Sequence, residues 1–248
     1  MPEEFSLSLT EVDAVAERAG LPRNWHPFEV PSVGTTLVDH ERAVTTAWDS
    51  LRARGLARQD KLDLEVAEAL ETWTRPEVLI IVRAVEIEDN LKVFYRAAAS
   101  GSVGVFSELA ADDIRFLQLR ADRLVNTVIG MLPPYVPVPL APLTITRGGR
   151  PDAPEDFSAM ASQRRANEKA LAKFSTWPPH RHGTVELSVR TSGRLRPVGT
   201  VNFLDTDGGR FLTFTEQLPG GETRYRFVPS DGSHLRRWLH ESITEARS

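Results

Sequence analysis

One pattern of residue types occurs twice in this chain, first from Pro76 to Leu132 and again from Gly183 to Ile243. The matched positions are Val78 with Val185, Ile80 with Leu187, Val82 with Val189, Arg83 with Arg190, Val93 with Val201, Tyr95 with Phe203, Gly101 with Gly209, Phe106 with Phe214, Glu108 with Glu216, Arg115 with Arg224, Phe116 with Tyr225, and Leu124 with Leu235. A repeat at roughly 108 residues is far longer than the repeats of solenoids. The pattern therefore predicts two copies of one supersecondary unit, related by a pseudo-two-fold axis.

Each copy contains four strand signals followed by a helix. In the first copy the branched or alternating segments are Glu77–Glu86, Leu91–Ala97, Ser102–Leu109 and Asp113–Leu119, and the helix begins at Asp122. In the second copy they are 184–190, 198–204, 210–217 and 222–228, and the helix is Ser233–Ala246. The connections between the strands are short, and short connections require neighbouring strands to be antiparallel.

The segments that precede the four strands differ between the copies. Before the first copy, alternation predicts a strand over Phe5–Leu9, and helical spacing predicts several helices. These helices begin at Thr10, Asp39 and Asp63. Before the second copy there is a strand over Leu143–Thr146 and a single helix over Glu155–Thr176, whose apolar residues are sparse. A helix that is this polar lies on the surface or awaits a partner.

A proline-rich passage joins the two copies. Prolines at positions 133, 134, 137, 139 and 142 make it extended and stiff, which favours a spacer over a ligand for an SH3-type groove. We expect an N-terminal half over 1–132, a joint over 133–142 and a C-terminal half over 143–248, together forming one globular domain. The predicted fold class is α+β, with a central antiparallel β-sheet flanked by helices in two pseudo-two-fold-related halves.

Composition limits the classes of partner. The apolar and charged fractions are 41% and 26%, and the net charge is −4 with the two signs interspersed, so we expect neither nucleic-acid binding nor membrane insertion. Cysteine is absent, which excludes disulfides and thiolate chemistry. The N-terminus has no basic and apolar segments of the kind that make a signal peptide. We therefore expect a cytoplasmic protein.

The sequence contains no pattern that indicates catalysis, a cofactor or a metal. No glycine-rich phosphate loop follows a strand and precedes a helix, and a hairpin turn accounts for Asp205 and Asp207 before Gly208. We interpret His180 and His182 as exposed loop histidines rather than metal ligands. Catalytic, cofactor-binding and metal-binding residues are all expected to be none, and the protein is not expected to be an enzyme.

The order of the segments resembles the EspG family of type VII (ESX) secretion-associated proteins of actinobacteria. The residues that carry the resemblance are 5–13, 51–56 before 62–66, the strand pair ending at Gly101 and Val105, and Arg224–Pro229. The resemblance covers nearly the whole chain. This chain is shorter than is usual for the family, and the missing length falls in the helical part of its second half. The resemblance implies that this region helps to contact the partner.

The resemblance implies a non-enzymatic cytosolic chaperone. It would bind the tip of a PE–PPE heterodimer, keep that heterodimer soluble and deliver it to the matching ESX machine. A WXG100-like or other ESX-linked helical hairpin protein is an alternative partner, and the chaperone itself would be a monomer or a weak homodimer. A rival hypothesis is a small-molecule-binding or hydrolytic protein that uses a cleft between the two halves.

A chaperone that holds an apolar helical tip needs a surface that mixes polar loop with a few apolar residues. The hairpin Glu86, Ile87, Glu88, Asp89 and Asn90 fits, because Ile87 is an apolar residue at a turn among carboxylates; alternatively, Ile87 simply ends its strand. The helix over 155–176 and the final helix would supply a second wall. The candidate contact residues, all on the first of these helices, are Phe157, Met160 and Phe174.

Aromatic side chains on the apolar faces of their elements are expected to anchor the core, because they bury the most area. These anchors are Trp48, Trp73, Phe116, Tyr225 and Trp238.

Overall fold

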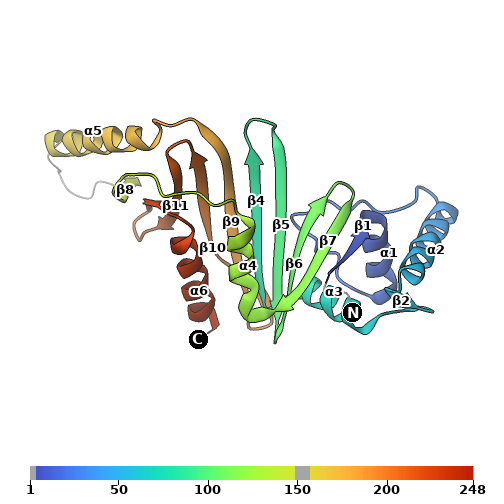
Figure 1. The fold of residues 1–248 in the computed structure, drawn as a ribbon. Coiled ribbons are helices and arrows are strands. Elements are labelled where there is room, and N and C mark those ends of the chain that lie inside the picture. Colours follow the sequence, from blue (N-terminus) through green and yellow to red (C-terminus); the bar gives the residue numbers. More distant parts are fainter. Residues whose placement is uncertain (1–3, 149–156, 248) are drawn as a thin grey trace.

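The central sheet has ten strands, five from each half of the chain (Figure 1). Each half arranges its five strands in the same order from the middle of the sheet to the edge. The computed structural model describes residues 4–148 and 157–247. From one edge to the other, the strands are β1 (Glu4–Ser8), β7 (Asp113–Arg120), β6 (Val103–Ala110), β5 (Leu91–Ser100), β4 (Val78–Glu86), β9 (Pro179–Thr191), β10 (Arg194–Thr206), β11 (Gly209–Gln217), β12 (Glu222–Pro229) and β8 (Leu143–Gly148). Neighbouring strands are antiparallel throughout. The predicted fold class is confirmed.

The two halves meet where β4 pairs with β9. The central register pairs are Val78 with Val189, Ile80 with Leu187, and Val82 with Val185. The repeat matches Ile80 with Leu187, Val78 with Val185 and Val82 with Val189. It therefore relates the first flanking pair to the second and relates the central pair to itself. The pseudo-two-fold axis therefore passes beside the Ile80–Leu187 pair. Both of these residues are fully buried.

The outer hairpins of the two halves also correspond. Glu108 on β6 lies opposite Arg115 on β7, and their side chains form an ion pair of 3.1 Å between Oε1 and Nη1. Glu216 on β11 lies opposite Arg224 on β12, with 3.1 Å between Oε2 and Nη1. These are the residues that the repeat matches, so two sequence-equivalent pairs make the same cross-strand contact.

The repeat alignment is wrong for β5 and β10. Ala99 lies opposite Val78, and Val201 lies opposite Val185, so Ala99 rather than Val93 is the structural equivalent of Val201. The chain makes a longer hairpin between β4 and β5 than between β9 and β10. The alignment kept one spacing of about 108 residues along the chain. Because the two hairpins differ in length, that spacing matches residues of β5 and β10 that are not structurally equivalent.

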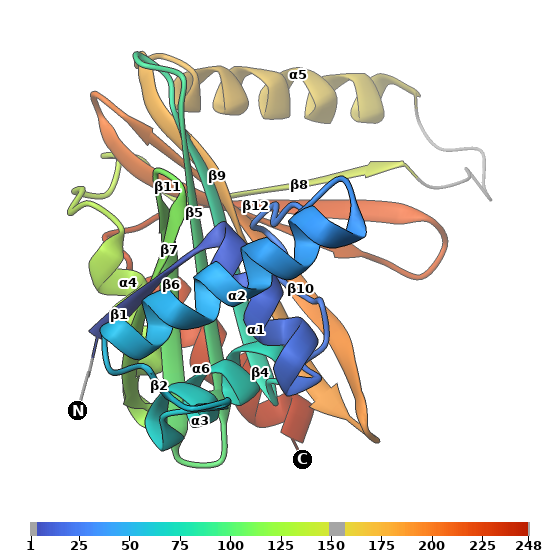
Figure 2. The same ribbon diagram turned by 90° about the vertical axis from the view of Figure 1, so that its right-hand side faces the viewer.

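Three helices cover one face of the first half: α1 (Leu9–Ala19), α2 (Leu37–Ala53) and α3 (Leu64–Thr74) (Figure 2). A small two-stranded ribbon of β2 (Ala57–Arg58) and β3 (Lys61–Leu62) lies between α2 and α3 in the chain. Trp48, Trp73 and Phe116 lie in the core beneath the helices, each at most 1% exposed, as predicted. This core fixes the helices of the first half to the sheet.

The first helix begins earlier than predicted. Its N-cap is Ser8 rather than Thr10, because Ser8 Oγ accepts a hydrogen bond from the Glu11 amide at 3.2 Å, and Glu11 Oε2 accepts one from the Ser8 amide at 2.9 Å. This reciprocal capping box ends β1 and starts α1 at one residue.

Two helices cover the opposite face of the sheet, α4 (Leu124–Met131) and α6 (Ser233–Arg247). A short 3-10 turn, η1 (Ala121–Arg123), precedes α4. The prediction that Asp122 caps this helix is wrong: α4 has no side-chain cap, and the Asp122 carboxylate binds the Arg120 guanidinium instead. Trp238 and Tyr225 are only partly buried, so they are weaker anchors than expected.

Helix α5 (Phe157–Phe174) covers the remaining face of the second half. The side chains of residues 157–161, 163 and 164 lie outside the described residues. In the part of the chain that the structure describes, no helix has both the length and the apolar character needed to cross a membrane. We retain the division into 1–132, 133–142 and 143–248 as a proposal, since the repeated strand order supports it.

Candidate functional site

The hairpin between β4 and β5 exposes apolar side chains among carboxylates. Ile87 is 40% exposed and Leu91 is 56% exposed, while Glu88 and Asp89 are exposed between them. Asn90 has a φ of 49°, in the left-handed region that asparagine tolerates better than most residues, and this lets the chain reverse. The hairpin therefore presents the mixed surface that the sequence predicts.

The second half of the molecule holds this hairpin. The Ile87 amide donates a hydrogen bond of 2.7 Å to the His180 carbonyl oxygen at the start of β9. Glu86 lies directly opposite Arg181 of β9, and their side chains form an ion pair. The hairpin is thus an extension of the sheet that β9 holds along its β4 edge, rather than a free loop.

Helix α5 lies at the same end of the sheet as the tip of this hairpin (Figures 1 and 2). A short connection links Phe174, the last residue of α5, to β9, whose second residue, His180, accepts the hydrogen bond from Ile87. The structure therefore brings together the two elements that the sequence proposes as walls of one docking surface.

Phe174 does not face a partner. It is 3% exposed, and its ring centroid lies 5.2 Å from that of Phe211 and 5.6 Å from that of Phe227. With Val138 these rings form a small core cluster. In the described part of the second half, no counterpart of α1–α3 covers this face of the sheet. Phe174 covers apolar side chains there that would otherwise face solvent. Phe157 and Met160 have side chains outside the described residues.

The rest of α5 is open to solvent over most of its described length. The exposed side chains include Arg165, Lys169 and Lys173. Beneath the helix is a cavity of about 200 Å³, lined by Ile145, Arg147, Leu171, Tyr225 and Phe227. Among the side chains of α5 that the structure describes, only Phe174 is fully buried, so this described part is attached through its C-terminal end.

Three other surface cavities, with volumes of about 380, 530 and 490 Å³, lie among residues of the first half. Each of the four cavities is lined by one half alone, so none of them is the cleft between halves that the rival hypothesis requires. The described residues contain no group of three or more potential metal ligands.

His180 lies on a strand, not in the loop that the sequence suggests. Its Nε2 is 2.5 Å from Oδ1 of Asp207, in the turn between β10 and β11. Prolines at positions 178 and 179 led to the loop interpretation, but Pro179 can begin a strand because a first strand residue need not donate to the ladder.

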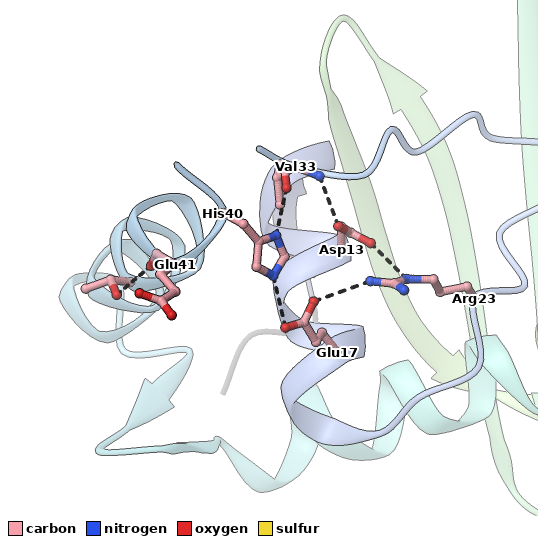
Figure 3. Close-up of polar contacts among 7 residues, drawn as sticks. Asp13, Glu17, Arg23, Val33, His40 and Glu41 are labelled. Carbon is pink, nitrogen blue, oxygen red and sulfur yellow. Dashed lines mark hydrogen bonds and ion pairs between the residues drawn. The ribbon is translucent and has the colours of Figure 1, made fainter. Parts of the chain in front are cut away.

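A polar cluster that the sequence did not indicate joins α1, α2 and the segment between them (Figure 3). Asp13, whose side chain is 1% exposed, accepts hydrogen bonds from Arg23 Nε at 3.0 Å and from the Val33 amide at 3.2 Å. His40 Nδ1 is 2.7 Å from the Val33 carbonyl oxygen, and its Nε2 is 3.0 Å from Oε1 of Glu17. Both partners of the ring can only accept, so this geometry favours the protonated ring, in which both nitrogens donate.

The electrostatics of this cluster agree with that protonation state. The hydrogen bond to Glu17, followed by that to the Val33 carbonyl, raises the pKa of His40 above its ordinary value. The hydrogen bond from His40 lowers the pKa of Glu17. None of the four cavities described above is lined by both His40 and Glu17, and the contacts of the cluster clamp the segment between α1 and α2.

A second set of polar residues was also missed. Arg181, Asp205 and Arg210 occupy inward-facing positions of β9, β10 and β11, where the alternation would place apolar residues. Asp205 is fully buried and Arg210 is 3% exposed. The sequence did contain a signal, because these charged residues fall at positions where every second residue of the strand is otherwise apolar. Sequence spacing alone, however, does not reveal which strands are neighbours.

Comparison with known proteins places these features in context. The model of the EspG family matches residues 8–241. Among solved structures, one similar chain comes from the Mycobacterium tuberculosis type VII secretion system chaperone EspG5 in complex with the PE25-PPE41 dimer. The TM-score is 0.63 at 11% identity, and the match covers 98% of this chain and 96% of that chain. Among curated proteins, none matches.

Proposed function

Because this chain belongs to the EspG family, we propose that it is a substrate-specific chaperone of a type VII (ESX) secretion system. The observation that carries the proposal is the match of the family model to residues 8–241, which spans both halves and the hairpin. The similar chain of known structure is described as a chaperone in complex with a PE25-PPE41 dimer. We propose a PE–PPE heterodimer as the partner here, with another ESX-linked helical hairpin protein as the alternative.

The function is binding without catalysis. The protein would act in the cytoplasm as a monomer or weak homodimer, keep the helical partner soluble and deliver it for export. An apolar helical tip is prone to aggregate, and a chaperone protects it by covering its apolar side chains. No nucleic acid, cofactor or metal takes part.

We place the docking surface on the hairpin Glu86–Asn90, with α5 as the second wall. Ile87 and Leu91 supply apolar contact area, and the carboxylates of Glu88 and Asp89 keep the free hairpin soluble. Interfaces of this kind concentrate their binding energy in a few apolar side chains surrounded by polar ones. Phe157 and Met160 remain candidate contacts on α5, whereas Phe174 acts by anchoring that helix.

The test is the double variant Ile87→Ser with Asp89→Arg, measured by co-purification and calorimetric titration with a PE–PPE heterodimer of the source organism. We expect affinity to fall at least about tenfold, because one apolar contact is lost and one charge is reversed. The matched control is Leu64→Ser with Glu68→Arg on α3, where Leu64 is 81% exposed. The control makes the same chemical changes far from the hairpin and should bind within about threefold of the unmodified protein.

If the folded hairpin variant binds the partner as tightly as the unmodified protein, the hairpin is not the docking site. If the unmodified protein binds neither the heterodimer nor a helical hairpin protein of the same gene cluster, the chaperone proposal itself fails. The two results are distinct, since the second needs no variant.

A further inference from the structure

Four residues of alternating charge lie side by side on four neighbouring strands at the hairpin end of the sheet. Glu86 of β4 is opposite Arg181 of β9, Arg181 is opposite Asp205 of β10, and Asp205 is opposite Arg210 of β11. Residues directly opposite one another in a sheet point to the same face. These four, which we call the charged row, share the face that α4 and α6 cover further along the strands.

Burial increases along the charged row from the hairpin inward. The side chains of Glu86 and Arg181 are 26% and 15% exposed, and those of Asp205 and Arg210 are 0% and 3% exposed. Arg210 binds Asp205 through two bonds, with Nε 2.5 Å from Oδ1 and Nη2 2.8 Å from Oδ2. Glu86 and Arg181 form the second ion pair.

Arg181 is the least satisfied member of the row. Its Nε is buried and has no hydrogen-bond partner among the described residues. Burial, with a contribution from the like charge of Arg210, lowers the pKa of Arg181, while Asp205 opposes this shift. Arg181 is therefore held between two carboxylates, Glu86 on one side and Asp205 on the other.

The ends of the charged row reach two different parts of the molecule. At one end, Glu86 immediately precedes Ile87, whose amide is bound to His180. At the other end, Arg210 Nη2 donates to the Pro133 carbonyl oxygen at 3.1 Å, and the guanidinium lies 5.3 Å from the centroid of the Tyr135 ring. The row thus connects the hairpin to the proline-rich joint.

Stability alone does not explain a buried row of charges, because well-packed apolar residues in its place are often at least as stable. Charges do specify register. A slip of β9 by one residue against β4 would turn Arg181 to the opposite face and separate it from Glu86, its ion-pair partner, and from the nearby charge of Asp205. Asp205 would keep its two bonds from Arg210, so the cost of the slip lies in the pairing of Arg181 with Glu86, and this cost favours the observed register.

We propose that the charged row is a positioning device for the hairpin, with Arg181 as its central positioning residue. The row holds β4 in register with β9 at the tip and ties the hairpin, through β10 and β11, to the joint. The effect on partner binding rests on the proposed function, whereas the effect on the hairpin does not.

The experiment substitutes Arg181→Met in the full chain, which keeps the length of the side chain and removes its charge. We expect hydrogen exchange of the Ile87 amide to accelerate about tenfold or more, and affinity for the PE–PPE heterodimer to fall by a similar factor. Arg181→Lys, which keeps the charge, should restore both to within about threefold. The matched control is Arg83→Met, which removes another ion pair between β4 and β9, that of Arg83 with Glu186 on the opposite face.

Unchanged exchange of the Ile87 amide in folded Arg181→Met would overturn the proposal, as would equal acceleration in Arg83→Met. If Arg181→Met does not fold, Glu86→Gln removes only the outermost charge of the row and must accelerate the same amide. The exchange measurement uses no partner, so it decides on the charged row even if the unmodified protein binds no PE–PPE heterodimer.

Discussion

The two halves of this molecule share a sheet unit but differ in what covers it. In the first half, α1, α2 and α3 pack on one face over a core that contains Trp48 and Trp73. In the second half, the same face carries α5 and a smaller cluster, whose buried members among the described residues are Val138, Phe174 and Phe211. The shared part builds the sheet. The parts in which the halves differ are those that the proposed function uses.

The hairpins next to the pseudo-two-fold axis show the same distinction. The β4–β5 hairpin extends to Glu86 and Leu91, whereas the β9–β10 hairpin reverses at Ser192 and Gly193. The longer hairpin carries the exposed Ile87 and one end of the charged row. A few extra residues at one hairpin thus give two otherwise symmetric halves one asymmetric surface. This is the surface that the proposed function uses.

The strongest test of the difference in cover is Trp73→Ala. This side chain is 1% exposed, packs edge-on against Phe116 at 5.2 Å and donates from Nε1 to Ser107 Oγ at 2.9 Å. We expect a loss of about 3–5 kcal/mol in the free energy of unfolding, measured by urea denaturation. Trp238→Ala, on α6 over the opposite face of the sheet, removes a partly buried ring and should cost about 2 kcal/mol. An equal or larger cost for Trp238→Ala would contradict the expectation that the fully buried ring beneath α1–α3 contributes more.

A second test asks whether Phe174 is the main attachment of α5. Phe174→Ala removes the ring that packs on Phe211 and Phe227, and we expect a loss of about 3 kcal/mol with faster amide exchange along α5. Phe174→Leu should retain most of the stability because it keeps the cavity largely filled. If α5 amides exchange at the same rate in Phe174→Ala, other contacts hold the helix.

The smallest effect concerns the clamp around His40, which lies in the first half. The pKa of His40 is raised, so its stabilisation is present below its ordinary pKa of 6.5 and is lost as the pH rises through the raised value. The pKa of Glu17 is lowered, so its contribution is present above 4.5 and is lost as the pH falls through the lowered value. The clamp is therefore strongest between about pH 4.5 and 6.5.

The measurement is the difference in unfolding free energy between the unmodified protein and His40→Gln at several pH values. We expect the difference to be larger at pH 6 than at pH 9. An NMR titration of the His40 ring should give a pKa above 6.5, and this shift should shrink in Glu17→Gln, which removes its main cause. A difference that does not depend on pH would contradict an imidazolium in the clamp.

Much of the fold could be predicted from local patterns. The branched run that became β4, and its counterpart in β9, carry enough apolar residues to identify two buried strands. Their alignment matched Ile80 with Leu187, and the structure shows that these two residues pair beside the axis. Glu108 with Arg115 and Glu216 with Arg224 each form the cross-strand ion pair, but the register places Gly104 rather than Phe106 at the position of Phe214, so the alignment is shifted by two residues in these hairpins too. Alternation and short connections specify such elements without reference to the rest of the chain.

The candidate site depended on tertiary structure to a greater extent. The weak amphipathicity of α5 did not reveal that Phe174 faces inward, since its burial follows from a sheet face left bare elsewhere in the chain. The charged row joins Glu86 to residues about a hundred positions away, and its members meet only because β4 pairs with β9. Local sequence determines which element a segment forms. Which elements become neighbours, and therefore which charges and rings must be paired or covered, is decided when the two halves close around their shared axis.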